Sequence, residues 1–491
     1  MVQIKKGPAA GPANNKEITT MEDTTFEVKI PEGASLNKRE ESSLVNPVMA
    51  ELLELIKPVD FRQKMNLEED ERPKQKHYVV LIVEGILEVA KAENYGLAVQ
   101  NSFIYIFNGT YWAALDSNEF KMFLAEAGER MGHRELDCKH YTFRNELFQQ
   151  FLATAYCPPP EPPQDVTLIN LQNGTLEVSP KGFKLRKHRR EDFLTYVLPF
   201  EYSPEASCPK FQAYLEEVQP DSSARQVLAE YVGYVFTRHI KLEKLLLLYG
   251  TGANGKSVFF DILNALLGKE NISNFSLANL NEEHNRAQIV NKLLNYGSEI
   301  RGKIDTDVLK QMASGEPIQA RLKYRNSFIT DRYAKLAFNC NELPTEVEHN
   351  EAFFRRFIIL PFEVTIPAER RNPSLAKEII ADELPGVLNW VLAALEKLLK
   401  QQKFTECNRV KEALARYRAE SDSVAMFLEE EAYKPSATEH KPLKQLYQDY
   451  RPFCIDNGYR TVSNRTFSKR LKALGYEAKR ISAGNVVFIE K

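Results

Sequence analysis

Residues 244–268 read KLLLLYGTGANGKSVFFDILNALLG, which is an apolar run, a glycine-rich loop and a second apolar segment in succession. The run KLLLLYG predicts a strand buried on both faces, and VFFDILNALLG predicts a helix that ends at Gly268. The eight residues from Gly250 to Ser257 fit the pattern G-x-x-x-x-G-K-[ST], which binds phosphate when it joins a strand to a helix. The stretch therefore predicts an α/β fold built around a nucleotide-binding loop.

The loop supplies the groups that hold a nucleotide. Glycines let its backbone N–H groups face an anion, and the start of the following helix adds the positive end of its dipole. We expect Lys256 to reach the β and γ phosphates and Ser257 to ligate Mg²⁺, so ATP and Mg²⁺ are the predicted cofactors. A chance glycine-rich turn, the alternative, does not account for the flanking strand and helix. The predicted nucleotide-binding residues are Gly250, Thr251, Gly252, Ala253, Asn254, Gly255, Lys256 and Ser257.

A second stretch, KLLNYGSEI, places the acidic Glu299 directly after a mixed apolar run. A P-loop ATPase requires a carboxylate at the end of a neighbouring strand, where it holds Mg²⁺ and polarises the attacking water. We assign this role to Glu299, because it is the only acid in the run. The alternative is a solvated Glu299, with Asp305 or Asp307 taking its place.

Two further stretches follow in the order expected of such a site. The run KLAFNCNELP predicts a strand that ends in Asn341, whose amide can orient the water beside the γ-phosphate; the alternative is a simple turn former. In FFRRFIILPF, Arg355 and Arg356 precede another predicted strand. An arginine at this place can complete the site of a neighbouring subunit and stabilise the developing phosphate charge, whereas paired arginines are otherwise surface charge.

Taken in order, the stretches GTGANGKS, NYGSEI, KQMASGEPIQARLKYRNSF, FNCNELP and FFRRFIILPF resemble the superfamily 3 helicases. The similarity is to the phage and plasmid primase-helicase branch, which also includes the poxvirus primase-helicase. It extends from about residue 100 to the C-terminus, through IYIFNGTYW, NGTLEV, FEYSPEASCPKFQAYL and ELPGVLNWVLAAL. The resemblance implies that Gly250–Ser257 is the Walker A loop, that Glu299 stands in Walker B, and that Asn341 is the sensor. It also implies that Arg356, in preference to Arg355, is the arginine finger.

The segment between Walker B and the sensor resembles the DNA-gripping hairpin of this superfamily, which projects into the channel of a ring. Its predicted tip is 320–325. We expect Arg321, Lys323 and Arg325 to meet phosphates and Tyr324 to stack on a base or sugar, a combination that tolerates any sequence. The alternative is an exposed edge hairpin with solubilising charges.

The C-terminal stretch 441–491 carries eleven Lys or Arg residues and four acids, in a chain whose formal net charge is −2. This local excess of positive charge favours a polyanion partner. Ser463 and Asn464 begin a predicted helix that ends at Gly475, and two predicted strands follow around 482–484. Helix and hairpin predict a winged-helix domain, the module usual in the family, with an interaction surface as the alternative. The predicted core residues are Phe467, Leu471 and Leu474, and the predicted DNA contacts are Arg465, Lys469 and Lys472.

The composition, 43% hydrophobic and 27% charged, is typical of a globular protein. The net charge excludes a uniformly basic coat, so a polyanion must meet a local patch. One such patch, Lys181–Arg190, has six Lys or Arg residues and is either a solvated face or a guide for a strand that enters the channel. Six scattered cysteines without a CxxC pair predict reduced thiols, and no apolar run predicts a signal peptide or membrane span. We expect the cytoplasm of a host cell.

A chain of 491 residues has room for about three domains. Asn-Gly turns at 108–109 and 173–174 predict hairpins in the N-terminal half, and the low apolar content of the first residues cannot offset their chain entropy. The predicted parts are a disordered arm (1–45), an α+β domain of helices and hairpins (46–215), an AAA+-like P-loop ATPase domain (216–370), a helical extension (371–425) and a winged-helix domain (426–491).

The leading interpretation is an ATP-dependent replicative DNA helicase of a phage or plasmid. It would translocate on single-stranded DNA as a homohexameric ring and unwind forked duplex. Residues 1–75 carry no DxD pair, so we expect a separate primase or polymerase as a partner. The alternative is a DNA-binding replication initiator or loader that uses ATP as an assembly switch. The finger, the sensor and Glu299 favour turnover, whereas a strongly sequence-specific origin site would favour the initiator.

Overall fold

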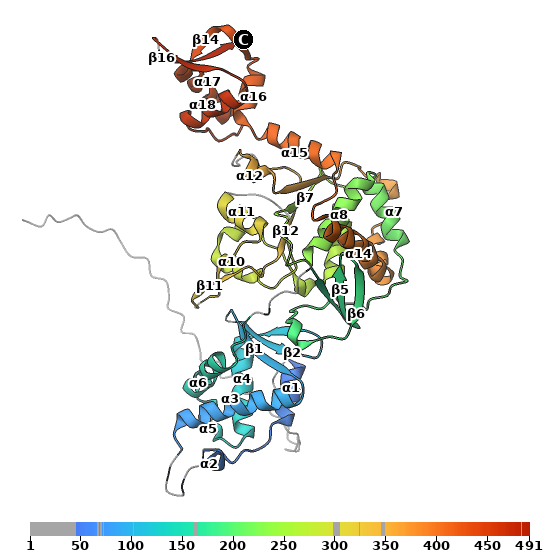
Figure 1. Cartoon of the computed structure of the whole chain (residues 1–491), viewed down its shortest axis with the longest axis vertical. Coiled ribbons are helices and arrows are strands. Elements are labelled where there is room, and N and C mark those ends of the chain that lie inside the picture. The colour runs from blue at the N-terminus through green and yellow to red at the C-terminus, as the bar shows by residue number, and fades with distance from the viewer. Residues whose placement is uncertain are drawn as a thin grey trace, which may run out of the picture. The chain divides into compact units, whose positions relative to one another are not determined.

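The computed structural model describes residues 46–491 except 66, 67, 69, 70, 72, 102, 159, 161–164, 298–304, 324, 345–348 and 483. The predicted arm at 1–45 and the predicted site residues Glu299 and Tyr324 lie outside the described residues. Figure 1 shows the described chain with many of its helices and strands labelled. They include a parallel sheet with helices between its strands, so the predicted α/β class is confirmed at this level.

The N-terminal elements are a cluster of helices and a three-stranded antiparallel sheet of order β1-β2-β3. In α3, Val79, Ile82 and Ile86 are buried because residues three or four apart share one helix face. The turn at Asn108-Gly109 joins β2 to β3, as predicted, with Gly109 at a φ of 91°. The elements are α1 (Pro47–Leu55), α2 (Phe61–Lys64), α3 (Gln75–Ala92), β1 (Gly96–Gln100), β2 (Phe103–Phe107), β3 (Trp112–Leu115), α4 (Ser117–Arg130), α5 (Glu135–Lys139) and α6 (Tyr141–Thr154).

A second antiparallel sheet comprises β4 (Thr167–Leu171), β5 (Gly174–Ser179) and β6 (Gly182–Arg186). The hairpin predicted at Asn173-Gly174 joins β4 to β5, with Gln172 and Asn173 in its turn and Gly174 as the first residue of β5. Ile169 and Leu176 of this sheet are buried in the same hydrophobic cluster as Leu246 and Leu248 of the parallel sheet. This shared core begins well before residue 215, where we placed a domain boundary from the sequence, and that boundary stays a prediction.

The parallel sheet has the strand order β13-β7-β12-β9-β8, and each neighbouring pair in it is parallel. Parallel strands need crossover connections, and α9 (Lys256–Leu267) supplies the one between β7 and β8. The strands are β7 (Leu245–Tyr249), β8 (Ile272–Ser273), β9 (Leu294–Gly297), β12 (Lys335–Cys340) and β13 (Phe357–Pro361).

The interior strand β7, which lies between β13 and β12, is buried on both faces, as its unbroken leucine run predicts. Successive side chains of a strand point to opposite faces. Leu246 and Leu248 accordingly lie in one hydrophobic cluster, and Leu245 and Leu247 lie in another. β7 therefore joins the two cores of this part of the chain, and the loop that follows it starts from a fixed strand end.

Helices surround this sheet, and a short hairpin interrupts the chain between β9 and β12. The hairpin confirms the one predicted around 320–325. Helix α8 ends at Val235, and the Thr237 hydroxyl donates to the Tyr234 carbonyl and closes the last turn. The elements are α7 (Pro209–Val218), α8 (Ser222–Val235), α10 (Glu283–Gln288), α11 (Thr306–Ser314), β10 (Ile318–Arg321), β11 (Ser327–Thr330), α12 (Glu351–Phe354), α13 (Leu375–Asp382), α14 (Leu384–Gln401) and α15 (Asn408–Glu420).

The C-terminal elements are three helices and an antiparallel sheet of order β14-β16-β15, as Figure 1 shows in part. Phe467 and Leu471 are buried as predicted, whereas Leu474 is 39% exposed, because the helix ends there and Gly475 takes a φ of 89°. Strand β14 was not predicted: its residues KPSATEHKP have no apolar alternation and are held by pairing with β16. The elements are α16 (Ser423–Glu430), β14 (Lys434–Pro442), α17 (Leu443–Asp456), α18 (Asn464–Ala473), β15 (Ala478–Ile481) and β16 (Gly484–Glu490).

Replacing Glu383 with alanine is expected to lower the free energy of unfolding by about 1–3 kcal/mol. The buried Glu383 carboxylate accepts the backbone N–H groups of Lys210 (3.0 Å) and Phe211 (2.9 Å), so it caps the start of α7 from the start of α14. Urea denaturation measures the change. Glu406→Ala, which removes an exposed carboxylate, is the control and should leave stability unchanged. Equal stability of Glu383→Ala and wild type would contradict the capping role.

Candidate functional site

The predicted phosphate loop, Gly250–Ser257, leaves the carboxyl end of β7 and enters α9. The Gly250 N–H donates to the Cys340 carbonyl (3.2 Å), which fixes the start of the loop beside β12. A Cβ at position 250 would lie 2.4 Å from the Phe362 carbonyl, and Gly255 has a φ of 84°. Both glycines are therefore required by geometry, the first for space and the second for its backbone conformation.

Side chains from outside the motif hold the loop in place. The Asn254 side chain donates to the Phe362 carbonyl (2.8 Å), and the Tyr214 hydroxyl of α7 donates to the Gly255 carbonyl (2.7 Å). The Ile366 N–H donates to the Ala253 carbonyl (2.9 Å). Sequence reasoning missed these supports, because Asn254 occupies a variable motif position and Tyr214 lies 41 residues before its partner.

Lys256 is buried at the first position of α9. Its ammonium donates to the Gly250 carbonyl (2.5 Å) and to Asn254 Oδ1 (3.1 Å), both within the loop itself. Burial lowers the pKa of Lys256 from its ordinary value. A phosphate would give this ammonium the opposite charge that the loop does not supply, so Lys256 fits its predicted role.

The first turn of α9 also fits a phosphate-bound metal ion. Ser257 is exposed beside Lys256, and its hydroxyl makes no hydrogen bond with the described residues. Mg²⁺ is bound by few protein ligands together with phosphates and waters. Within the described part of the chain, no group of three His, Cys, Asp or Glu side chains could hold a metal by itself.

Asn341 lies at the same edge of the sheet as the loop. It follows Cys340, which pairs with Tyr249 in the parallel β12–β7 ladder, and its side chain is exposed. Strand β9 lies on the other side of β12, and Glu299 follows β9 by two residues. Because β7, β12 and β9 are parallel, the described ends of β12 and β9 lie at the same edge of the sheet as the start of the loop. Glu299 itself falls outside the described residues.

The two predicted finger arginines lie in different surroundings. The Arg356 side chain is 10% exposed; it donates to the Ser314 hydroxyl (3.0 Å) and the Ala352 carbonyl of its own chain. The Arg355 side chain is 50% exposed and pairs with Glu243. Arg355 is therefore the more accessible member of the pair, although the family resemblance favours Arg356 as the finger.

The predicted DNA hairpin has only part of its basic tip exposed. Arg325 donates to the Ser117 hydroxyl (2.9 Å), and its guanidinium lies over the Phe148 ring. Arg321 is 48% exposed and lies 3.5 Å from the Glu283 carboxylate, and Lys323 is exposed.

Arg286 supports the base of this hairpin and was missed by sequence reasoning. Its guanidinium donates to the carbonyls of Gln319 (2.7 Å) and Leu280 (3.0 Å). It stands in a polar segment without a motif, so no sequence signal marks it.

The predicted DNA contacts of the C-terminal helix share an open surface. Arg465, Lys469 and Lys472 on α18 are all exposed and form no ion pair with the described residues. Arg470 on the same helix is instead paired with Asp422 (3.2 Å). The predicted residues thus remain available to a polyanion.

Within the basic patch 181–190, Arg186 is already neutralised, because it forms ion pairs with Glu177 and Asp192.

All six cysteines have free thiols, in agreement with the prediction from their spacing. Of the helices in the described part of the chain, none combines the length and apolar character needed to cross a membrane.

Models of three protein families match parts of the chain. Residues 86–220 match a family described as D5 N terminal like, and residues 419–488 match one described as Poxvirus D5 protein-like. Residues 248–356, which contain the loop, match a family of unknown function, DUF5906. The chain therefore contains D5-type regions on both sides of the loop, and the predicted resemblance to the poxvirus branch is confirmed.

Viral proteins named as helicases are homologues of the chain. "Putative helicase 121R" of Invertebrate iridescent virus 3 is 24% identical over 332 residues, which cover 59% of this chain and 35% of that protein. "Putative helicase L207/L206" of Acanthamoeba polyphaga mimivirus is 23% identical over 278 residues, 53% of this chain and 28% of that protein. The matched region thus spans about a third of the length of these curated relatives.

Solved structures of the NrS-1 C terminal region were also matched. One apo structure aligns with 85% of this chain and 99% of its own chain, at a TM-score of 0.44 and 12% identity. A second, of residues 305–718, aligns at a TM-score of 0.46 and 13% identity, covering 84% of this chain and 100% of its own.

Replacing Asn254 with alanine is expected to lower the free energy of unfolding by about 1–3 kcal/mol, because the Phe362 carbonyl and the Lys256 ammonium both lose a buried partner. Chemical denaturation followed by tryptophan fluorescence measures the change. Thr251→Ala, at an exposed position of the same loop, is the matched control and should behave as wild type. If the two variants unfold alike, Asn254 does not brace the loop.

Proposed function

We propose that the protein is an ATP-dependent DNA helicase with a P-loop, AAA+-like ATPase core of the superfamily 3 type. The observation that carries the proposal is the loop Gly250–Ser257, which connects an interior strand of a parallel sheet to a helix and presents Lys256 at that helix's start. The viral homologues named as helicases support the same reading.

In the proposed reaction, ATP binds across the loop with its phosphates on the backbone N–H groups and Lys256. When bound, Mg²⁺ would neutralise phosphate charge, with Ser257 and Glu299 as its protein ligands. Glu299 would also accept a proton from the attacking water, which Asn341 would orient. The placement of Asn341 beside the loop supports this assignment.

We further propose that the protein works as a ring of identical subunits, with six as the expected number. Arg355 would then enter the neighbour's site and stabilise charge on the transferred phosphate. Its 50% exposure supports this choice over Arg356, which is occupied within its own chain. Arg356 would position the segment from which Arg355 projects.

DNA would be held at two surfaces. Lys323 and Arg321 on the β10–β11 hairpin would contact the phosphates of a single strand, and Arg325 would hold the hairpin to the N-terminal part. The C-terminal elements would form a winged-helix domain that contacts DNA through α18. We also propose that β4–β6 belong to the ATPase domain, since they share its core.

ATP hydrolysis and strand separation on a forked DNA duplex test the proposal directly. Wild type is expected to separate the strands, Lys256→Ala to lose hydrolysis, and Glu299→Gln to bind ATP while hydrolysing it about 10²- to 10⁴-fold more slowly. Glu406→Gln is the surface control. If Lys256→Ala hydrolyses ATP at the wild-type rate, the proposal is wrong. DNA-stimulated hydrolysis without strand separation would favour an initiator or loader.

Mixed assemblies test the role of Arg355. Arg355→Ala alone is expected to lower hydrolysis about 10³-fold or more without loss of stability. Mixing Arg355→Ala subunits with Glu299→Gln subunits should restore hydrolysis, because some interfaces then combine an intact Glu299 with an intact Arg355. Arg356→Ala should instead unfold at lower urea concentration, since the Ser314 hydroxyl loses its buried partner. Failure of the mixture to hydrolyse ATP would rule out Arg355 as a residue acting between subunits.

A further inference from the structure

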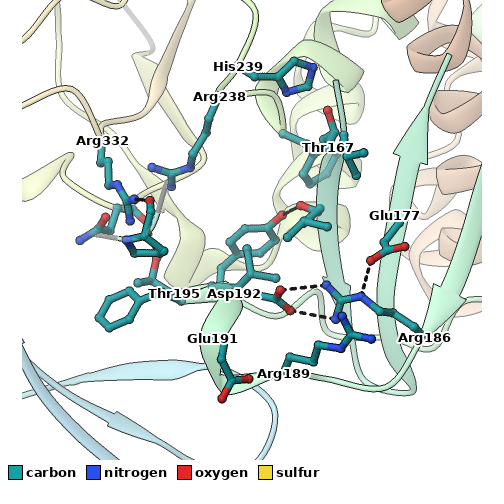
Figure 2. A pocket seen from close by; sticks show the side chains of 18 residues that line it. Thr167, Glu177, Arg186, Arg189, Glu191, Asp192, Thr195, Arg238, His239 and Arg332 are labelled. Carbon is teal, nitrogen blue, oxygen red and sulfur yellow. Dashed lines mark hydrogen bonds and ion pairs between the residues drawn. The ribbon is translucent and has the colours of Figure 1, made fainter. Parts of the chain in front are cut away.

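A cavity of about 380 Å³ lies among the β4–β6 sheet, the segment 189–196 that follows it, the residues after α8 and Arg332. Figure 2 shows the cavity and the side chains that line it. None of its lining residues belongs to the loop Gly250–Ser257, to the β10–β11 hairpin or to α18, although Arg186 and Arg189 are part of the basic patch 181–190. Its volume is in the range of small-molecule sites.

One wall of the cavity is electrostatically balanced. Arg186 donates to Glu177 Oε1 (2.5 Å) and to Asp192 Oδ1 (2.9 Å), and Figure 2 draws both interactions. The Arg186 and Asp192 side chains are only 10% and 13% exposed, so the positive charge of Arg186 is used within the protein. This wall needs no ligand to be stable.

The opposite wall carries two guanidinium groups without acidic partners. Figure 2 shows Arg238 and Arg332 next to each other on this side. The Arg238 guanidinium makes no hydrogen bond or ion pair with the described residues. Among those residues, the Arg332 guanidinium donates only to the Pro160 carbonyl (2.6 Å). Burial, and then the charge of Arg238, lowers the pKa of Arg332 to about 10. Arg238 is exposed and Arg332 is partly buried, so two adjacent cations line the cavity without a described acidic side chain in contact with either.

Further positive charge lies behind these arginines. Arg238 also borders a second cavity, which is lined by Lys241, Lys292 and Lys335. Burial, followed by the charges of Arg238 and Lys241, lowers the pKa of Lys335 to about 7, and its ammonium lies 4.1 Å from the centre of the Tyr234 ring. The excess of positive charge at Arg238 and Arg332 therefore continues into this second cavity.

The described acids near this group do not balance it. Desolvation lowers the pKa values of Arg238 and Arg332, and the exposed Asp331, which forms no ion pair with either, offsets only part of that lowering. Asp165 acts in the same way on His239. The C-terminal end of α8 favours a nearby cation, but a helix dipole falls off within one turn and offsets only part of one charge.

Uncharged groups complete the lining. Thr167 is 2% exposed, and its hydroxyl has no hydrogen-bond partner among the described residues. His239 lies on the same rim as Arg238 in Figure 2, and burial lowers its pKa, which favours the neutral ring. The Thr167 hydroxyl is itself inaccessible, so the groups that face the cavity as donors are the two arginines and His239.

We propose that this cavity binds the phosphate group of a small phosphate monoester such as a mononucleotide, with Arg238 and Arg332 as its charged donors. Arginine pairs match the oxygens of phosphate, and one doubly charged phosphate would neutralise two guanidinium groups. The proposal does not rest on the proposed helicase activity, because it uses none of the residues assigned to that function.

Calorimetric titration of adenosine monophosphate into full-length Lys256→Ala protein tests the proposal, because this background removes the loop lysine. Saturable binding is expected, and inorganic phosphate should compete for it. In the Lys256→Ala background, a second substitution, Arg238→Gln or Arg332→Gln, should weaken the binding of adenosine monophosphate about tenfold or more. Adding Arg134→Gln, an exposed arginine outside the cavity, should leave binding unchanged.

Thermal denaturation of the same variants separates binding from folding. Without ligand, Arg238→Gln should be at least as stable as its parent, because it removes an unbalanced charge. Adenosine monophosphate should raise the melting temperature of the parent and of the Arg134→Gln variant only. Sodium chloride at equal ionic strength should not raise the melting temperature of either protein. The proposal is wrong if ligand stabilises the Arg238→Gln and Arg332→Gln variants as much as the parent, if chloride has the same effect, or if no saturable binding is found.

Discussion

The burial of β7 on both faces is the constraint on which the rest of the chain depends. Its alternating leucines enter two separate hydrophobic clusters, so any shift of this strand would disturb both. Because β13 and β12 flank it in parallel register, the carboxyl end of β7 is fixed on both sides. The loop after Tyr249 therefore starts from a rigid edge, and the proposed phosphate binding would gain precision from such an edge.

That rigidity is extended into the loop by contacts from distant parts of the sequence. Tyr214 from α7 and the segment after β13, through the Phe362 carbonyl, both hold the loop backbone. In the same arrangement Lys256 is turned onto loop oxygens, Gly250 O and Asn254 Oδ1. A ligand phosphate would compete with these weak acceptors for a buried cation, which favours the anion because charge-assisted hydrogen bonds are stronger than neutral ones.

The sequence predicted the elements that are marked by local patterns. The loop between β7 and α9, both Asn-Gly hairpins and the cap at Ser463 were found because strand, turn and cap signals are short-range. Strand β14 was missed because pairing with β16, and not its own pattern, makes it a strand. The burial of Arg356 and the engagement of Arg325 were missed for a related reason, since their partners lie 42 and 208 residues away.

The cavity beside β4 illustrates how much of a site can escape sequence reasoning. Its arginines come from the turn after α8 and the turn before β12, and neither stretch contains a motif. Arg238 reaches the cavity because α8 stops at Val235, where the Thr237 hydroxyl closes the last turn. Had the helix continued to Ile240, Arg238 would lie on a helix face. The charge of the cavity wall thus follows from the point at which a single helix ends.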